Sequence, residues 1–207
     1  MSENLSKLFG GEAKLKTIKL FVFNPEQAFD AIQISQKIKE NLQRTRSELS
    51  SLEKAHFIKR KIFFKSEIKK IRNKKVVKKV KTNGWVLNKN FEFLTPLQQF
   101  LIKVNHLNPR EIAHKLGKGG NLKLLVLSGV FIQDPESRVD LLVVGDHLKR
   151  AMVEGAIRAI ESEMGRELRY AVFETPDFQY RLGLYDKLIR DILDYPHEKI
   201  VNKMGVI

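Results

Sequence analysis

The chain has 207 residues, no cysteine, 43% hydrophobic residues and a formal net charge of +14. This length allows one large or two small domains, and the hydrophobic content is ordinary for a globular protein. The lack of cysteine excludes a disulfide scaffold, an iron–sulfur centre and a thiolate zinc site. The sequence has neither a signal-peptide pattern at its start nor an apolar run of the ~18–20 residues that a membrane-spanning helix needs. We therefore expect a cytoplasmic protein without a membrane partner.

The positive charge is confined to the first half of the chain. Residues 1–103 contain 23 Lys and Arg against 9 Asp and Glu, whereas residues 104–207 contain 15 of each. Residues 54–89 alone hold 14 basic side chains and one acidic side chain. This asymmetry predicts a polyanion-binding module joined to a neutral module with another role. The alternative is a solvated basic face that aids solubility, although solubility does not require such tight clustering of one sign.

Apolar residues at helical spacing predict three helices near the start of the chain. They cover residues 11–23, about 28–39 and about 41–55, and Asn41 is the expected N-cap of the third helix. The third helix has an apolar face and an opposite polar face. The polar face consists of Gln43, Arg44, Ser47, Ser50, Ser51 and Lys54.

Two strands and a connecting helix are expected to follow. The strands cover residues 57–64 and 76–88, with a very basic loop between them, and Asn83-Gly84 predicts a turn. A helix over 95–102 is expected to bridge the domains. Four aromatic residues are either core residues, the interpretation we favour, or stacking partners for RNA bases: Trp85, Phe91, Phe93 and Phe100.

Helices and strands alternate in the second half, which is typical of an α/β module. The expected helices cover residues 109–116, 153–165 and 180–193. The expected strands cover residues 121–132, 138–144 and 168–173. The five histidines show no paired ligand spacing, so we expect no metal site and no cofactor.

The third helix and the start of the strand after it carry a recognisable pattern. Thr45, Leu49, Leu52, Glu53 and Ile58 follow the order Thr-x-x-x-Leu-x-x-Leu-Glu-x-x-x-x-Ile. This stretch resembles the recognition helix and first wing strand of winged-helix transcriptional regulators, and the resemblance extends over about residues 8–90. It implies a winged helix-turn-helix domain whose recognition helix, about residues 41–55, binds double-stranded DNA.

The polar and basic side chains of the third helix and of the segment after it support the same expectation. A helix fits the major groove of B-DNA, and residues near its N-terminus reach base edges. Arginine binds guanine and glutamine binds adenine, so the candidates for base contacts are Gln43, Arg44 and Ser47. Phosphate contacts position a protein without reading sequence. Their candidates are Arg46, Lys54, Lys59, Arg60, Lys61, Lys65, Lys69, Lys70 and Arg72.

The second half carries a weaker pattern, formed by Ser128-Gly129 and by the segment from Ser137 to Val144. It resembles the minimal nucleotidyltransferase domain of the polymerase-beta superfamily, in which a Gly-Ser turn and an Asp-x-Asp motif hold a triphosphate and two metal ions. Here the Gly-Ser order is inverted, Arg138 stands at the first aspartate position, and only Asp140 matches. A cation at that position opposes Mg²⁺ and can pair with Asp140. We therefore expect no catalytic residues; if the domain were active, Asp140 would be the residue involved.

Together these features predict an α+β protein with an N-terminal winged helix-turn-helix domain (1–92), a connecting helix or linker (93–106) and a C-terminal α/β nucleotidyltransferase-like domain (107–207). The expected function is that of a DNA-binding transcriptional regulator, nucleoid-associated if prokaryotic. A homodimer is expected because helix-turn-helix proteins often read two half-sites. The second domain would serve dimerisation, ligand sensing or partner binding. The alternatives are an active nucleotidyltransferase acting on nucleic acid, and an antitoxin or adaptor with a protein partner.

Overall fold

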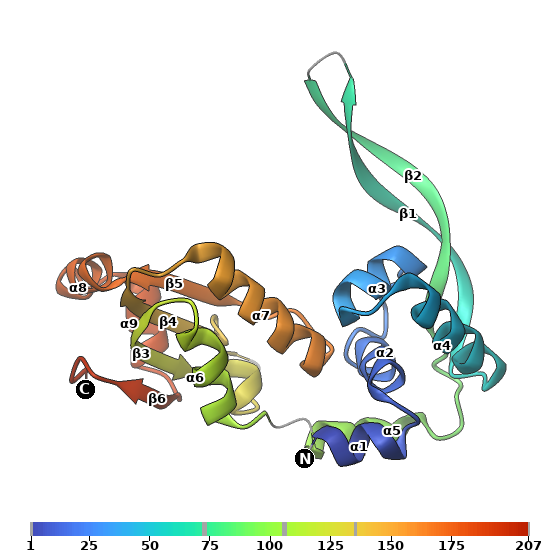
Figure 1. Ribbon diagram of the computed structural model, residues 1–207, viewed down its shortest axis with the longest axis horizontal. Helices are drawn as coiled ribbons and strands as arrows, with labels where there is room; N and C mark the ends of the chain where they lie inside the picture. Colours follow the sequence, from blue (N-terminus) through green and yellow to red (C-terminus); the bar gives the residue numbers. More distant parts are fainter. Residues whose placement is uncertain (1, 72–73, 105–106, 135, 207) are drawn as a thin grey trace. The chain divides into compact units, whose positions relative to one another are not determined.

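The computed structural model describes residues 2–71, 74–104, 107–134 and 136–206 (Figure 1). It divides into two compact units: Met1–Val104 with Ser162–Arg166, and Asn105–Glu161 with Glu167–Ile207. Each unit contains helices and a small sheet, so the expected α+β class is confirmed. Among the described residues, no helix is both long and apolar enough to cross a bilayer.

The first unit contains five helices in the described part of the chain. They are α1 (Ser2–Leu8), α2 (Glu12–Phe23), α3 (Ala31–Ile38), α4 (Leu42–Lys54) and α5 (Leu94–Val104). The helices expected over 11–23, 28–39, 41–55 and 95–102 are thereby confirmed within a few residues, whereas α1 was not expected. The side chains of Phe21, Phe29, Ile34, Leu49 and Leu101 are almost fully buried and belong to one hydrophobic core.

Local capping fixes the turn between α3 and α4. Asp30 and Gln33 form a reciprocal capping box at the start of α3. Lys39 adopts a left-handed conformation (φ 55°) and ends that helix. Asn41 then caps α4, as expected, because its side chain accepts a hydrogen bond of 2.8 Å from the backbone N–H of Arg44. A three-residue turn therefore joins two helices whose inner faces share one core.

A long antiparallel hairpin follows α4 and projects beyond the helices of its unit (Figure 1). Its strands are β1 (Ile58–Ile71) and β2 (Lys74–Leu87), paired continuously from Ile58–Leu87 to Ile71–Lys74. The expected strands are confirmed, but the loop expected between them is wrong over most of its length. The lysine-rich stretches remain in strands because each strand satisfies the backbone groups of the other, whatever its side chains.

The turn expected at Asn83-Gly84 is also wrong. Gly84 lies inside β2, opposite Lys61. Next to it, Phe29 and Trp85 exchange two backbone hydrogen bonds of 3.0 and 2.9 Å. A Cβ atom on Gly84 would lie 2.3 Å from the carbonyl oxygen of Phe29. Glycine is therefore required here for the close approach of two backbones, not for a turn.

We expect Gly84→Ala to destabilise the first unit by about 1–3 kcal/mol, because the added methyl group must push β2 away from Phe29. Urea unfolding followed by the fluorescence of Trp85, the single tryptophan of the chain, measures this change. Gly117→Ala, on α6 of the second unit, is the control and should leave the unfolding transition reported by Trp85 unchanged, since nothing lies within 4 Å of the added Cβ atom there. Equal stability of the two variants would contradict the packing argument.

The aromatic residues expected in the core divide into two pairs. Trp85 is buried at the base of the hairpin, and Phe91 packs against the core of the first unit. Phe93 and Phe100 are exposed, which corrects the expectation for these two residues. Phe93 contacts the ring of Phe91 at a centroid distance of 5.9 Å, and Phe100 lies 6.3 Å from the ring of Phe9.

The second unit is a four-stranded mixed sheet with flanking helices. Its strands are β3 (Asn121–Leu127), β4 (Leu141–Asp146), β5 (Tyr170–Glu174) and β6 (Glu198–Asn202). The order is β5-β4-β3-β6, with β4 and β5 parallel and the other neighbours antiparallel. Its helices are α6 (Pro109–Gly117), α7 (Arg150–Met164), α8 (Thr175–Gly183) and α9 (Lys187–Leu193), and a 3₁₀ turn, η1, covers Gly129–Phe131.

The two central strands are buried on both faces. Residues 124–127 of β3 and 141–144 of β4 are all buried, although successive side chains point to opposite sides of a sheet. On one side, Leu124, Val126, Leu142 and Val144 share a core with Phe178 of α8 and with Ile189 and Ile192 of α9. These continuous apolar runs explain why both strands were predictable from the sequence. The expected ranges, 121–132 and 138–144, are wrong at one end each, because β3 ends at Leu127, before η1, and β4 begins only at Leu141.

The helix expected over 180–193 is wrong, because the chain forms α8 and α9 instead. Tyr185, in a left-handed conformation (φ 55°), separates them. Asp186 then caps α9, accepting a hydrogen bond of 2.9 Å from the backbone N–H of Leu188. The strand β6 was not expected either.

Candidate nucleic-acid interface

Helix α4 has one buried face and one exposed polar face. Thr45, Leu49 and Leu52 are buried in the core of the first unit, whereas Gln43, Ser47, Ser50 and Lys54 are exposed. Successive residues of a helix are rotated by about 100°, so these four exposed residues form a single strip opposite the buried face. The strip runs the length of the helix and contains no acidic residue.

The two arginines near the start of α4 flank this strip on either side. Arg46 is exposed and lies towards one edge. Arg44 lies towards the other edge, where its Nη1 atom is 3.8 Å from Glu40 Oε2 and its side chain remains half exposed. Within the described part of the chain, no hydrogen bond or ion pair engages the side chains of Gln43, Arg46 and Ser47. The expected base-contact candidates therefore lie on one side of α4, with Gln43 and Ser47 central and Arg44 at the margin.

None of the five residues of the sequence pattern is fully exposed, so they serve the packing of the protein. Thr45, Leu49, Leu52 and Ile58 are buried, and the Thr45 hydroxyl donates to the carbonyl oxygen of Asn41 (2.9 Å). The fifth residue, Glu53, is partly buried and connects α4 to the hairpin. The pattern therefore specifies how the helix and the first strand pack together.

Glu53 joins the end of α4 to the base of the hairpin. Arg60 Nε donates to its two carboxylate oxygens at 2.8 and 3.0 Å, and Trp85 Nε1 donates to Oε2 at 3.0 Å. The Arg60 guanidinium also stacks over the indole ring, 4.2 Å from its centroid. These hydrogen bonds from Arg60 and Trp85 hold the pKa of Glu53 below its ordinary value. Arg60, a candidate for phosphate contact, is thus already engaged within the protein.

We expect Glu53→Gln to lower the stability of the first unit by about 1 kcal/mol at pH 7, because a half-exposed charge-assisted contact is lost. A depressed pKa in the folded state stabilises the protein above the unfolded value of about 4.3, and this stabilisation disappears as the pH falls through the lower folded value. The difference between wild type and variant should therefore vanish in acid. Urea unfolding at pH 7 and pH 3 measures it.

Glu92→Gln removes an exposed glutamate from the same unit and is the control for Glu53→Gln. It should leave the stability unchanged at both pH values. A Glu53→Gln variant that matched the wild type at pH 7 would show that the contact with Arg60 and Trp85 does not hold the hairpin to α4.

A second contact joins the hairpin to α3. Lys65 Nζ lies 2.7 Å from Oδ2 of Asp30, the N-cap residue of that helix. Burial alone would raise the pKa of Asp30, but hydrogen bonds from Lys65 and from the backbone N–H of Gln33 outweigh it, so this pKa is lowered. Lys65, another phosphate candidate, therefore has an internal partner as well.

Most of the remaining cations lie on α4 and on the two strands of the hairpin. Lys54, Lys59 and Lys61 are exposed, and no hydrogen bond or ion pair in the described residues engages their side chains. Lys78, Lys79 and Lys81 of β2 are exposed too. The backbones of Lys69 and Lys70 lie in β1, but the side chains there are outside the described part, as is the whole of Arg72. Lys54, Lys59 and Lys61 are therefore the phosphate candidates that the structure presents most openly.

In the second unit, Asp140 is buried and completely engaged. Its Oδ1 atom accepts hydrogen bonds from the Val130 backbone (3.0 Å) and from Arg169 Nη2 (3.1 Å). Its Oδ2 atom accepts from the Arg169 backbone (2.8 Å) and from Arg169 Nε (3.2 Å). Gly129, at φ 54°, leaves no space beside this carboxylate, because a Cβ atom there would lie 2.1 Å from Oδ1. Asp140 thus ties the turn after β3 to the start of β5.

The surroundings of Asp140 differ in two ways from the expectation. Arg138 pairs with Asp191 (2.8 Å) and not with Asp140, whose partner is Arg169. The strand β4 begins at Leu141, so Arg138 and Asp140 precede it and strand alternation does not orient them. In the described part of the chain, no three acidic or histidine side chains gather as a metal-binding group.

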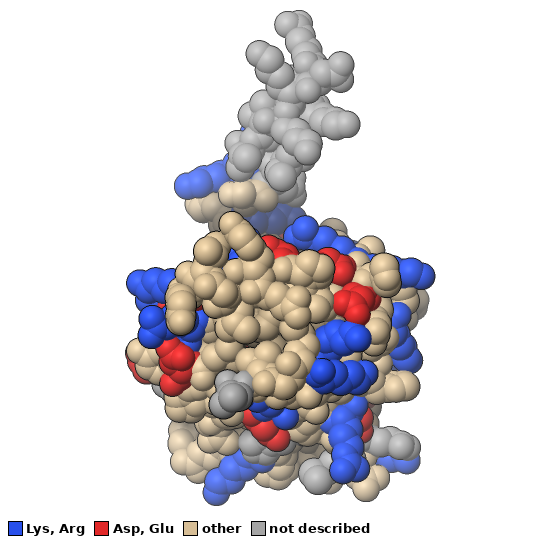
Figure 2. All heavy atoms as spheres, turned by 90° about the vertical axis from the view of Figure 1, so that its left-hand side faces the viewer, with Lys and Arg blue, Asp and Glu red and all other residues tan. Residues whose placement is uncertain are grey.

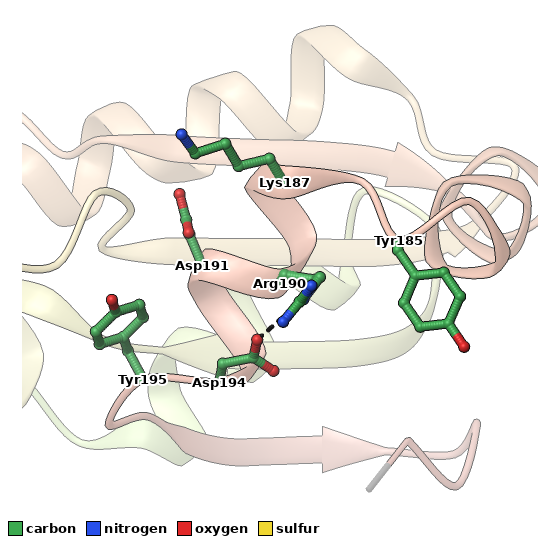
Figure 3. Close-up of a pocket in the computed structure, with 6 residues that line it drawn as sticks. All are labelled: Tyr185, Lys187, Arg190, Asp191, Asp194 and Tyr195. Carbon is green, nitrogen blue, oxygen red and sulfur yellow. Dashed lines mark hydrogen bonds and ion pairs between the residues drawn. The ribbon is translucent and has the colours of Figure 1, made fainter.

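The second unit also carries uncharged surface around α8 and α9. Figure 2, viewed from the side of α8, shows a broad area without charged side chains and charges of both signs around it. Tyr180, Leu184, Tyr185 and Tyr195 are all more than half exposed. A hollow of about 510 Å³ lies on α9 and is lined by Tyr185, Lys187, Arg190, Asp191, Asp194 and Tyr195 (Figure 3). Two of these residues, Arg190 and Asp194, lie four residues apart in the chain and form an ion pair at 3.2 Å. Exposed tyrosines and this ion pair therefore share the surface around α9.

Comparisons with known protein families, with curated proteins and with solved structures found no match to this chain.

Proposed function

We propose that this chain is a DNA-binding transcriptional regulator whose first unit is a winged helix-turn-helix domain. The observation that carries the proposal is the exposed strip of α4, which holds Gln43, Ser47, Ser50 and Lys54 and lies beside a strongly basic hairpin. A helix of this kind fits the major groove, and flanking cations match the charge of the phosphate backbone. Such an arrangement divides base contacts from phosphate contacts.

Gln43 and Ser47 are the proposed central base contacts, and Arg44 is the contact at the edge of the same face. All three lie in the first two turns of α4, the part of a recognition helix that reaches base edges. Arg46, Lys54, Lys59 and Lys61 are the proposed phosphate contacts. Arg60 and Lys65 act differently in this proposal, because their ion pairs with Glu53 and Asp30 support the orientation of the hairpin.

The second unit is proposed to be a non-catalytic nucleotidyltransferase-like domain that serves dimerisation, ligand sensing or partner binding. The four hydrogen bonds to Asp140 support this view, because both oxygens of the carboxylate already have partners inside the protein. Its balanced charge and the exposed tyrosines around α9 are suited to contact with a neutral or mixed surface. A homodimer would place two α4 helices on two half-sites.

Selection of duplexes from a random pool, followed by affinity measurements on the selected sequence, tests the proposal. Gln43→Ala should cost about 1–3 kcal/mol of discrimination at one or two base pairs while leaving nonspecific affinity almost unchanged. Gln179→Ala, an exposed glutamine of α8, is the control and should retain full discrimination. If no duplex is enriched, or if Gln43→Ala retains the selectivity of the wild type, then α4 is not a recognition helix.

A further inference from the structure

Two apolar side chains of the hairpin stand open to solvent. Ile62 is 59% exposed and Phe64 is 68% exposed. Both belong to one face of β1, because alternate residues of a strand point to the same side. Large apolar side chains placed side by side in the open are costly to hydrate, and such a pair among polar neighbours points to contact with another molecule.

The neighbours of this pair are polar or basic. Opposite Ile62 on β2 lies Asn83, opposite Phe64 lies Lys81, and opposite Ser66 lies Lys79. Direct partners across an antiparallel pair project to the same face, so both lysines share the face of the apolar pair. This combination of exposed apolar side chains with cations differs from a purely electrostatic phosphate contact.

The same face leads directly to α4. Arg60 precedes Ile62 and Phe64 on it, and Arg60 is the residue that contacts Glu53 at the end of α4. On the opposite face, Lys65 pairs with Asp30 of the helical body. These two ion pairs hold β1 on either side of the apolar pair in sequence, at residues 60 and 65. Ile62 and Phe64 therefore lie on a segment of β1 that two ion pairs hold to the helices of the first unit, next to the proposed recognition helix.

The charge of the hairpin indicates which kind of molecule binds this face. A second copy of residues 54–89, which include the hairpin, would bring 14 basic residues and one acidic residue against an equal set, which is repulsive. A polyanion with apolar surface between its charges satisfies both features at once. Duplex DNA has this character, because the hydrophobic faces of its bases become accessible when a base step is opened.

We propose that Ile62 and Phe64 form an apolar wedge. It would enter the minor groove next to the major-groove site of α4 and partly unstack a base step, which bends the duplex. This inference rests on the proposed function. Apolar wedges of Phe, Leu, Ile, Met or Pro kink DNA by about 20–90° in proteins that use them. Lys79 and Lys81 would bind the phosphates on either side of the opened step. The ion pairs of Arg60 and Lys65 would keep the hairpin from bending away from the helices when the wedge enters the DNA.

The test uses the intact protein and a selected duplex of about 30 base pairs with a fluorophore at each end, so that energy transfer reports bending. Four variants are compared with the wild type: Phe64→Leu, Phe64→Ser, Phe64→Lys and, as control, Phe93→Ser. Phe93 is an exposed aromatic residue of the same unit that lies outside the hairpin. Thermal unfolding of each variant verifies that the first unit remains folded.

A wedge predicts that the wild type, Phe64→Leu and Phe93→Ser bend the duplex alike. Phe64→Ser should lose the bend and bind about tenfold more weakly, as expected when one stacking contact is lost. Phe64→Lys should lose the bend although it adds a cation. If the wild type binds the duplex without bending it, or if Phe64→Ser bends it normally, the wedge is wrong and the proposed function stands.

Two further outcomes would overturn the wedge in different ways. Failure of the wild type to bind any duplex would overturn the proposed function together with the wedge. The second outcome concerns a lipid surface, which is tested with vesicles that contain one third phosphatidylserine. If the wild type binds these vesicles, Phe64→Ser does not bind them, and Phe64→Ser still bends the duplex normally, then the apolar pair contacts lipid and the inference is overturned.

Discussion

Replacing Asp140 by alanine should lower the free energy of unfolding of the second unit by about 2–4 kcal/mol, because a buried carboxylate that accepts four hydrogen bonds is lost, although the side chain of its partner Arg169 is half exposed. The Asp140 side chain is 2% exposed, and its loss leaves the Arg169 guanidinium and the backbone N–H groups of Val130 and Arg169 without their acceptor. Urea unfolding followed by far-UV circular dichroism measures the change. Hydrogen exchange in peptides from β3, β4 and β5 locates it in this unit.

Arg190→Ala is the control for Asp140→Ala. Its ion pair with Asp194 is exposed on both sides, so the stability should change by no more than about 0.5 kcal/mol. An Asp140→Asn variant that retained wild-type stability but abolished a Mg²⁺-dependent nucleotidyl transfer would contradict the structural role of this carboxylate. That result would restore the nucleotidyltransferase alternative.

Replacing Lys54, Lys59 and Lys61 together by alanine should weaken duplex binding by about a hundredfold or more at 0.1 M salt. Each phosphate contact contributes about 0.9 to the slope of log affinity against log salt, so the slope should fall by about 2.7 if all three lysines bind phosphates. The three side chains are exposed, and no hydrogen bond or ion pair in the described residues holds them. Their removal therefore costs little folding stability, and fluorescence anisotropy across a salt series measures the binding directly.

The control for this variant replaces three exposed lysines of the second unit, Lys118, Lys149 and Lys203, by alanine. It changes the net charge by the same amount and should leave the salt slope at its wild-type value. If both triple variants reduced the slope equally, binding would depend on total charge rather than on the surface beside α4.

Much of the first unit was predictable because its elements have strong local signals. The apolar period of α2, α3 and α4, and Asn41 as an N-cap, are readable in the sequence and are confirmed by the structure. The pattern from Thr45 to Ile58 was found as a resemblance to a known family, and four of its five residues are buried in the structure. The placement of Gln43 and Ser47 on the exposed face follows from the apolar period of α4.

The errors arise where long-range contacts decide the structure. Gly84 is inside a strand because Phe29, far away in sequence, packs against its backbone. Asp140 pairs with Arg169, 29 residues later, and not with the nearby Arg138. The internal partners of Arg60 and Lys65 were hidden for the same reason. One error has a local cause instead. The break between α8 and α9 was missed although Gly183 and the N-cap residue Asp186 are local signals for it, and Tyr185 between them adopts a left-handed conformation.

Binding of the intact protein to duplex DNA, single-stranded DNA and RNA of equal length, measured across a salt series, tests the central claim most directly. The proposed function predicts tight binding to a selected duplex, enriched in one motif and preferably in an inverted repeat, with steep salt dependence and much weaker binding to single strands. Equal affinity for every polyanion, without enrichment of any duplex, would contradict it. Residues 54–89 would then be a nonspecific basic segment, and α4 would not read DNA sequence.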